Sequence, residues 1–415
     1  MTAEPARARL LDEERNRAWV DLARAAGILL VILFHVYFGL VRQTEPAESL
    51  RLAAETPWWL SIAWQALGSE IVFLTSSFLL CYLLVREHDM TGRIDYRTYV
   101  VRRIARIVPM YYLALALYAL ASGAGPMEIL RSALFLATIL GFDSVVPVGW
   151  SMEAMMQAYL LLPPLVLLAL RSGRPLALAL GLVAASIAFR AWGVLRLEGI
   201  DYSRIFPEAV RTEQFPEALD PLYLMVWFRA TPFLAGLALA LLVSLRHREL
   251  GAWLAPARHW LPALALGAVL VLWAGFQPVQ DGDAWVYRAF GETYWALFAA
   301  LQRPVLVAGL CLIALVLFYA RPGRSQALTG LFHARPWRLI AEHIYAIYLF
   351  HFPCILIAAV IVFRSTDPAV LGGATLAHVL AIWIVAAALS LLVAIPLTRL
   401  VELPFRRRVA RKGAR

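Results

Sequence analysis

An arginine and a histidine, Arg24 and His35, stand eleven positions apart in one of the most apolar runs of the chain. A helix would place them on nearly the same face, roughly 16 Å apart along its axis. An arginine is a fixed cation suited to phosphate, and a histidine can act as a general base. Ionisable groups inside a lipid-embedded helix are costly to bury and mark a functional site by default.

The same pair also has a purely structural interpretation. Arg24 could extend its side chain to the lipid headgroups, and His35 could hydrogen-bond a neighbouring helix. Taken alone, the pair leaves both interpretations open.

A second group of basic residues, Arg102, Arg103 and Arg106, stands at the start of another apolar run. Arg103 and Arg106 are one helical turn apart, and guanidinium groups so clustered can bind a polyanion such as a nucleotide phosphate. The alternative is an anchor that only sets the topology of the chain. On the cluster alone, the topological interpretation is favoured.

These residues must be positioned by membrane helices. Of the 415 residues, 61% are hydrophobic and 16% are charged, against about 45–50% and about 25% in soluble domains. The net charge of +10 is scattered among apolar spans, which argues against nucleic acid and favours topology signals. The composition therefore predicts an all-α, polytopic membrane protein.

Apolar runs of about 20 residues can cross the hydrocarbon core, and the chain has about ten of them. Segment 127–142 is apolar but short, and we expect a re-entrant or interfacial helix there. The predicted spans are 18–40, 59–85, 104–121, 148–170, 175–195, 222–244, 256–276, 294–320, 339–363 and 372–399.

The basic residues predict the topology. With an even number of spans and both termini in the cytoplasm, the segments around Arg86–Arg103, Arg171–Arg174, Arg246–Arg248, Arg321–Arg338 and the tail all lie inside. We expect a cytoplasmic N-terminal segment at 1–17, a transmembrane domain at 18–404 and a basic cytoplasmic tail at 405–415.

Five motifs in sequence order resemble the membrane-bound acyltransferase family 3, whose members O-acylate envelope glycans and some secondary metabolites. The chain has a counterpart of each of five family motifs. In order, they are Asp-x-x-Arg with the Arg-to-His spacing, an acidic residue before an apolar second helix, Arg-Arg-x-x-Arg-Ile-x-Pro-x-Tyr-Tyr, Tyr-x-x-Tyr-Leu-x-His-x-Pro and Glu-x-Pro-Phe. The counterparts are Asp21, Arg24 and His35; Glu70; Arg102 through Tyr112; Tyr345, Tyr348, Leu349, His351 and Pro353; and Glu402, Pro404, Phe405 and Arg406.

One departure concerns the fourth span. The family often carries Trp-Ser-x-x-x-Glu-Glu-Gln-x-Tyr, and here Met155 and Met156 stand where the glutamates would be. Glu153 lies two positions earlier, about 200° away around a helix. The departure points to an unusual acceptor.

The resemblance implies an O-acyltransferase of the cell inner membrane that moves an acyl group, most simply acetyl, from cytoplasmic acyl-CoA to a sugar hydroxyl. It implies no metal, and the three cysteines lack metal-ligand spacing. The implied catalytic residues are His35, Glu153 and Asp21; the donor-binding residues are Arg24, Arg102, Arg103 and Arg106; the supporting residues are Glu70, Trp150, Tyr348, His351 and Glu402.

Two alternatives stay open at this point. The acceptor could be a small secreted metabolite instead of a glycan, which the missing glutamates would suit. The intramembrane His, Arg and Glu residues could instead serve a transporter or flippase, although the sequence has no internal repeat.

Overall fold

A computed structural model describes residues 10–43, 52, 55, 67–196, 224–275, 285–320 and 335–412. This described part of the chain is helical and contains no strand. Short 3-10 helices at Leu10–Asp12 and Pro368–Gly373 and a π-helix at Thr398–Glu402 accompany the α-helices. The α-helices are α1 (Glu14–Gln43), α3 (Gly68–Thr91), α4 (Tyr96–Ser122), α5 (Pro126–Ala133), α6 (Gly149–Arg171), α7 (Pro175–Arg196), α9 (Ala230–Leu245), α10 (His247–Leu254), α11 (Ala257–Gly275), α12 (Trp285–Tyr319), α14 (Arg335–Phe363), α15 (Leu376–Leu397) and α16 (Leu403–Lys412).

Within the described ranges, nine helices are long and apolar enough to cross a membrane. A tenth is reached if α9 and α10, bent by 87° at a short break, form one span. The prediction of an all-α protein with about ten spans is therefore confirmed. Segment 127–142 holds only the eight-residue α5 and turns, and it is too short to cross.

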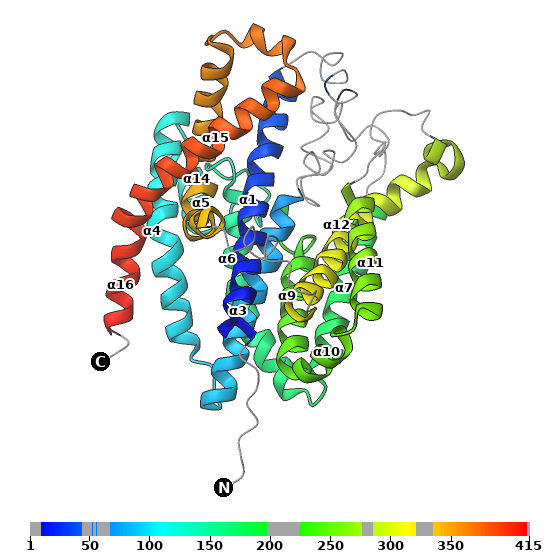
Figure 1. Cartoon of the computed structure of the whole chain (residues 1–415). Helices are drawn as coiled ribbons and strands as arrows, with labels where there is room; N and C mark the ends of the chain where they lie inside the picture. The colour runs from blue at the N-terminus through cyan, green and yellow to red at the C-terminus, as the bar shows by residue number, and fades with distance from the viewer. Residues whose placement is uncertain are drawn as a thin grey trace.

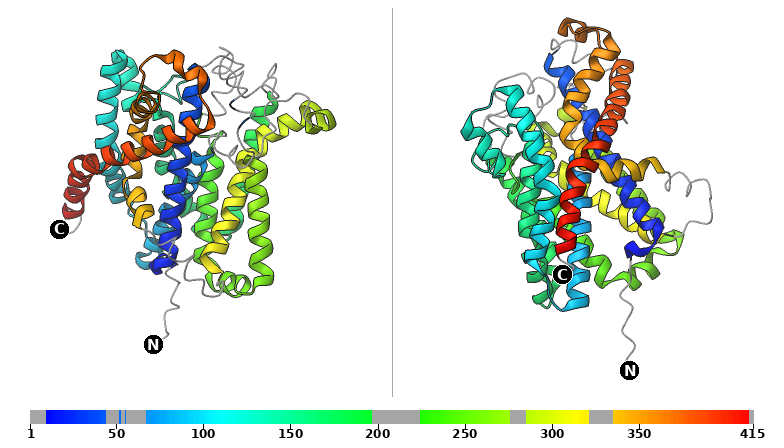
Figure 2. Two further views of the ribbon diagram at one scale, coloured as in Figure 1. Left: turned by 45° about the horizontal axis from the view of Figure 1, so that its top comes forward. Right: turned by 90° about the vertical axis from the view of Figure 1, so that its left-hand side faces the viewer.

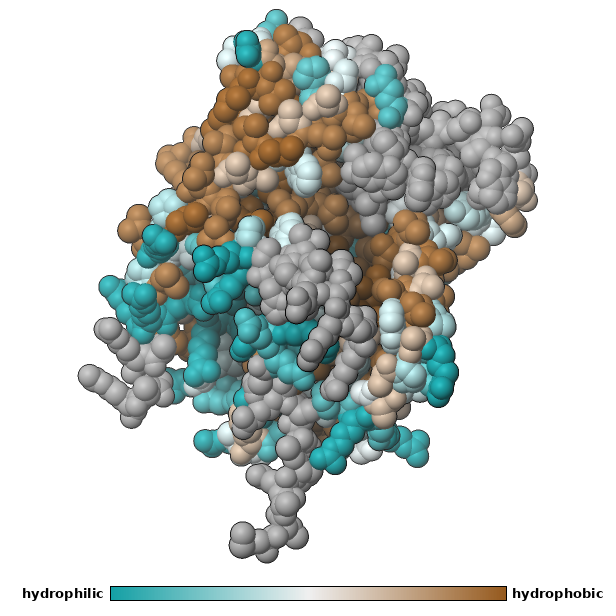
Figure 3. Space-filling view, viewed as in Figure 1, coloured by the Kyte–Doolittle hydropathy of each residue, from teal (hydrophilic) through white to brown (hydrophobic). Residues whose placement is uncertain are grey.

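Two groups of helices meet along α3. On one side α1 packs against α3, α14 and α15, and on the other side α3 packs against α9. Helices α11 and α12 run together beyond α9 (Figures 1 and 2). Apolar residues cover the upper and middle parts of the face in Figure 3, as expected of a surface that contacts lipid.

Helices α1 and α3 approach each other closely at a pair of glycines. A Cβ added to Gly68 would lie 2.6 Å from the carbonyl oxygen of Gly27 and 2.8 Å from the amide nitrogen of Val31. Small residues of this kind allow helix backbones to come together in a membrane. This contact sets the position of the half of α1 that carries Arg24 and His35.

The turn between α3 and α4 sets the start of the arginine-bearing helix. Helix α3 ends at Thr91 and is capped by Gly92, whose φ of 72° suits a residue without a side chain. Asp95 then caps α4, accepting hydrogen bonds from the amide of Thr98 (3.0 Å) and from its hydroxyl (2.7 Å). These two donors hold the pKa of the Asp95 carboxyl below its usual value.

Helix α1 begins and α16 ends toward the same end of the bundle (Figure 1). Polar residues gather at that end in Figure 3. The even number of crossings and the compartment that this end faces stay predictions. The same is true of the domain boundaries at 17 and 404, and residues 1–9 of the N-terminal segment lie outside the described part.

Candidate active site

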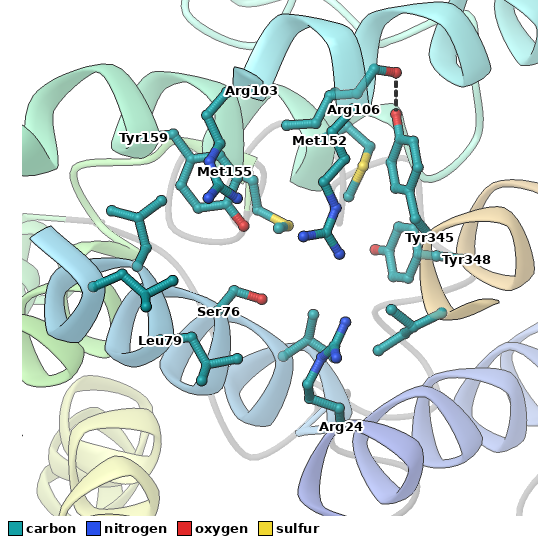
Figure 4. Close-up of a pocket in the computed structure, with 15 residues that line it drawn as sticks. Arg24, Ser76, Leu79, Arg103, Arg106, Met152, Met155, Tyr159, Tyr345 and Tyr348 are labelled. Carbon is teal, nitrogen blue, oxygen red and sulfur yellow. Dashed lines mark hydrogen bonds between the residues drawn. The ribbon is translucent and has the colours of Figure 1, made fainter. Parts of the chain in front are cut away.

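A cavity of about 190 Å³ lies between α1, α3, α4, α6 and α14. Three arginines from two helices line it: Arg24 from α1, and Arg103 and Arg106 from α4 (Figure 4). The guanidinium groups of Arg24 and Arg106 point toward one another across the cavity. We call it the arginine cavity.

The arginine cavity unites two of the predicted motifs but excludes one residue. Arg103 and Arg106 lie one turn apart and line it, as their spacing predicts. Arg102 is exposed and does not line it. A shift of one position on a helix turns a side chain by about 100°, which separates Arg102 from its neighbour.

Carboxylates stand at the edge of the arginine cavity. Asp21 Oδ1 is 3.8 Å from Arg24 Nη1, and Glu402 Oε1 is 3.8 Å from Arg106 Nε. Glu402 is buried, lies in the π-helix before α16, and is closer to Arg406, at 3.0 Å. Among the described residues no carboxylate lines the cavity itself, so the charged side chains that line it are all cationic.

Arg103 has the clearest capacity for a ligand. Its guanidinium lies over the rings of Tyr99 and Tyr159, 5.5 and 5.8 Å from their centroids. Its Nε is buried and has no hydrogen-bond partner among the described residues. Cation–π contacts orient a guanidinium but leave its donors available for an anion.

Aromatic and sulfur-bearing side chains complete the wall. Tyr345 donates its hydroxyl proton to the Ile107 carbonyl at 2.8 Å (Figure 4), and the Tyr348 hydroxyl lies 2.6 Å from Ser151 Oγ. Met155, which stands where the family often has a glutamate, faces the cavity (Figure 4). Its neighbour Met156 is buried and does not line the cavity.

His35 contacts a second histidine from the far end of the sequence. His35 Nδ1 lies 2.8 Å from His351 Nε2, and His351 Nδ1 lies 2.7 Å from the Tyr348 carbonyl oxygen. Tyr348 itself lines the arginine cavity. Neither histidine lines that cavity, and Tyr348 is the residue that connects the histidine pair to it.

Glu153 is buried and lies outside the arginine cavity. Its Oε2 accepts hydrogen bonds from the Thr138 amide (2.8 Å) and the Thr138 hydroxyl (2.9 Å). These bonds tie α6 to the turns that follow α5, which is a structural task. The predicted catalytic role of Glu153 stays a prediction.

Glu70 lies in a separate, buried ion cluster. Its Oε1 accepts from Arg229 at 2.8 Å and from Arg303 at 2.7 Å. Arg229 also lies over the ring of Trp150, 5.1 Å from its centroid. Thus Glu70 and Trp150, both predicted to be supporting residues, share one partner.

Several of these residues were missed from the sequence. Arg229 and Arg303 each interrupt an apolar run, and that is the signal that could have found them. Ser151 and Tyr159 occupy the serine and tyrosine positions of the family's fourth-span motif, and that match is the signal that could have found them.

Comparisons with known proteins concern the family of the chain. A family model, acyltransferase family 3, described as "Acyltransferase domain", matches residues 17–399. One curated relative, "Putative peptidoglycan O-acetyltransferase YrhL" of Bacillus subtilis (strain 168), is 23% identical over 362 residues, which cover 82% of this chain and 48% of the relative. The chain therefore spans about half the length of that relative. No solved structure matches.

Proposed function

This chain belongs to acyltransferase family 3, and from that membership we propose that it moves an acyl group from acyl-CoA to a hydroxyl of a glycan-type acceptor. Acetyl is the simplest group, and peptidoglycan, which appears in the name of the Bacillus relative, is the first acceptor to test. The donor would bind from the cytoplasm, and the enzyme would reside in the inner membrane.

The observation that carries this proposal is the arginine cavity. Three guanidinium groups face a space without a lining carboxylate among the described residues. Guanidinium groups bind phosphate with charge-assisted, often bidentate hydrogen bonds. Acyl-CoA offers several phosphates on one molecule, so Arg24, Arg103 and Arg106 would hold its anionic part.

The chemical step needs a base, and His35 is suited to it. The acceptor oxygen attacks the thioester carbonyl carbon, the carbon–sulfur bond breaks, and His35 takes the hydroxyl proton. That proton then passes to the CoA thiolate, so the products are an O-acyl ester and free CoA. Holding both substrates in a closed membrane site favours transfer over hydrolysis by water.

Purified protein in lipid nanodiscs would test the proposal with acetyl-CoA as the donor. Release of free thiol and formation of O-acetyl ester on peptidoglycan fragments are the expected results. Failure to release thiol with any hydroxylated acceptor, glycan or small metabolite, would count against acyl transfer and favour a transporter. Transfer to small hydroxylated metabolites alone would assign the second acceptor class.

His35→Ala tests the assigned base. We expect the rate of transfer to fall by at least about 100-fold, within the range that a general base contributes. Binding of acetyl-CoA should be retained, because His35 does not line the arginine cavity. A folded variant that transfers acyl groups at the normal rate would remove the base assignment.

A further inference from the structure

The hydrogen bonds around His351 determine where its proton lies. His351 is fully buried, and its Nδ1 is 2.7 Å from the Tyr348 carbonyl oxygen. A carbonyl oxygen can only accept, so Nδ1 carries the proton and donates it. A second proton would place a charge among apolar helices, at a high cost, so Nε2 of His351 is an acceptor.

The same reasoning then applies to His35. Its Nδ1 lies 2.8 Å from His351 Nε2, and an acceptor there requires a donor on His35. The Val31 carbonyl, one turn earlier on α1, is a second acceptor at the His35 ring and also requires a donor there. His35 therefore carries its proton on Nδ1, which leaves a lone pair on Nε2. His35 as a residue is only partly buried, whereas His351 is fully buried.

We infer that His351 is a positioning residue: it holds His35 in the Nδ1–H tautomer and so makes Nε2 of His35 the nitrogen that accepts the substrate proton. This inference rests on the proposed function for its kinetic consequence, but the tautomer itself does not depend on it. When Nε2 of His35 takes the proton, the bond from Nδ1–H to His351 becomes charge-assisted and stronger.

Aromatic packing holds the same ring in place. The ring centroids of Phe34 and Phe352 are 5.1 and 4.7 Å from that of His35. Tyr348 links this arrangement to the donor side, since its carbonyl orients His351 and its side chain lines the arginine cavity. A single turn of α14 therefore orients both the base and part of the cavity wall.

Substitutions at His351 separate positioning from packing. Gln places an amide oxygen near the site of Nε2 and can accept from His35, whereas Leu and Asn cannot reach it. We expect His351→Leu and His351→Asn to lower kcat by about 100-fold, at the lower end of the contribution of a general base. The KM for acetyl-CoA should stay unchanged, and His351→Gln should restore most of kcat.

His343 offers a matched control on the same helix. It is also buried, and its Nδ1 bonds the Leu339 carbonyl at 2.9 Å, but it does not contact His35. His343→Leu should leave kcat near that of the wild type. If His343→Leu lowers kcat as much as His351→Leu, or if His351→Leu leaves kcat unchanged, positioning by His351 is wrong.

The tautomer can be measured without any substrate. In protein with 15N-labelled histidine, a long-range 1H–15N spectrum should show a protonated Nδ1 and an unprotonated Nε2 for His35, assigned by its loss in His35→Ala. His351→Leu should shift both signals toward a mixture of tautomers. A protonated Nε2 in the wild type would overturn the inference, whether or not the protein transfers acyl groups.

Discussion

Two groups of arginines lie in the membrane part of this protein, and they are arranged in opposite ways. In the Glu70 cluster, a buried carboxylate oxygen is 2.8 Å from Arg229 and 2.7 Å from Arg303. In the arginine cavity, the nearest carboxylates are 3.8 Å from Arg24 and from Arg106, at the edge. The first group encloses its anion, whereas the second faces a space.

The difference separates a structural role from a ligand-binding role for the same residue type. A buried charge must be paired closely, since an uncompensated charge in a low-dielectric interior is costly. Glu70 lies in α3, Arg303 lies in α12, and Arg229 directly precedes α9. The cluster therefore joins these three helices. Arg103 instead lines a cavity, and its guanidinium lies over the rings of Tyr99 and Tyr159 rather than beside a carboxylate.

The largest expected effect comes from breaking the closed cluster. Glu70→Leu leaves two buried guanidinium groups without their carboxylate, and removal of one partner of a buried pair costs about 3–5 kcal/mol. Thermal unfolding in nanodiscs should show a large fall in the midpoint. Glu249→Leu, which breaks an exposed pair with Arg246, should cost less than about 1 kcal/mol. Equal midpoints for the two variants would contradict the structural role of Glu70.

The next effect concerns the open cavity. Arg103→Ala should weaken acetyl-CoA binding by about 10- to 100-fold, corresponding to one charged hydrogen-bonding group, and leave the unfolding midpoint nearly unchanged. Calorimetric titration with acetyl-CoA measures the change. Arg97→Ala provides the control, because Arg97 is an exposed residue of α4 that does not line the cavity. Unaltered affinity in Arg103→Ala would reduce the cluster to a topology signal.

A smaller effect should follow when a carboxylate is added to the wall of the arginine cavity. Met155→Glu would place a carboxylate on its wall and make it resemble the Glu70 cluster. Acetyl-CoA binding should weaken by about tenfold, the loss of roughly one charge-assisted contact, and the pairing should not destabilise the fold. Met155→Gln has nearly the same shape without the charge and should bind acetyl-CoA more tightly than Met155→Glu. Tighter binding by Met155→Glu would show that the arginines do not hold the donor.

The smallest effect is expected at Arg102, where the family motif and the structure imply different roles. The motif groups Arg102 with Arg103, whereas the structure leaves Arg102 exposed and off the cavity. Arg102→Ala should therefore change acetyl-CoA affinity by less than about twofold, as a solvent-screened charge would. A loss as large as that of Arg103→Ala would restore Arg102 to the donor site.

Local patterns predicted much of the fold and two of the three arginines of α4 that were expected to lie together at a cavity. Hydrophobic run lengths predicted the spans, because the thickness of the hydrocarbon core sets the length of a crossing helix. Helical periodicity placed Arg103 and Arg106 on one side of α4, since residues three apart are neighbours on a helix. Both rest on short stretches of chain and need no knowledge of other helices.

The sequence by itself determined that the chain crosses a membrane, that it belongs with acyltransferases, and that Arg24 and His35 share a helix. Only the tertiary structure decided what each touches: His351 stands 316 positions beyond His35, and Arg24 meets the α4 arginines across a cavity. Likewise it turned Glu153 toward Thr138 and Met155 toward the arginines. The physical reason is that helix periodicity is local, whereas contacts between helices depend on close packing, such as that at Gly27 and Gly68.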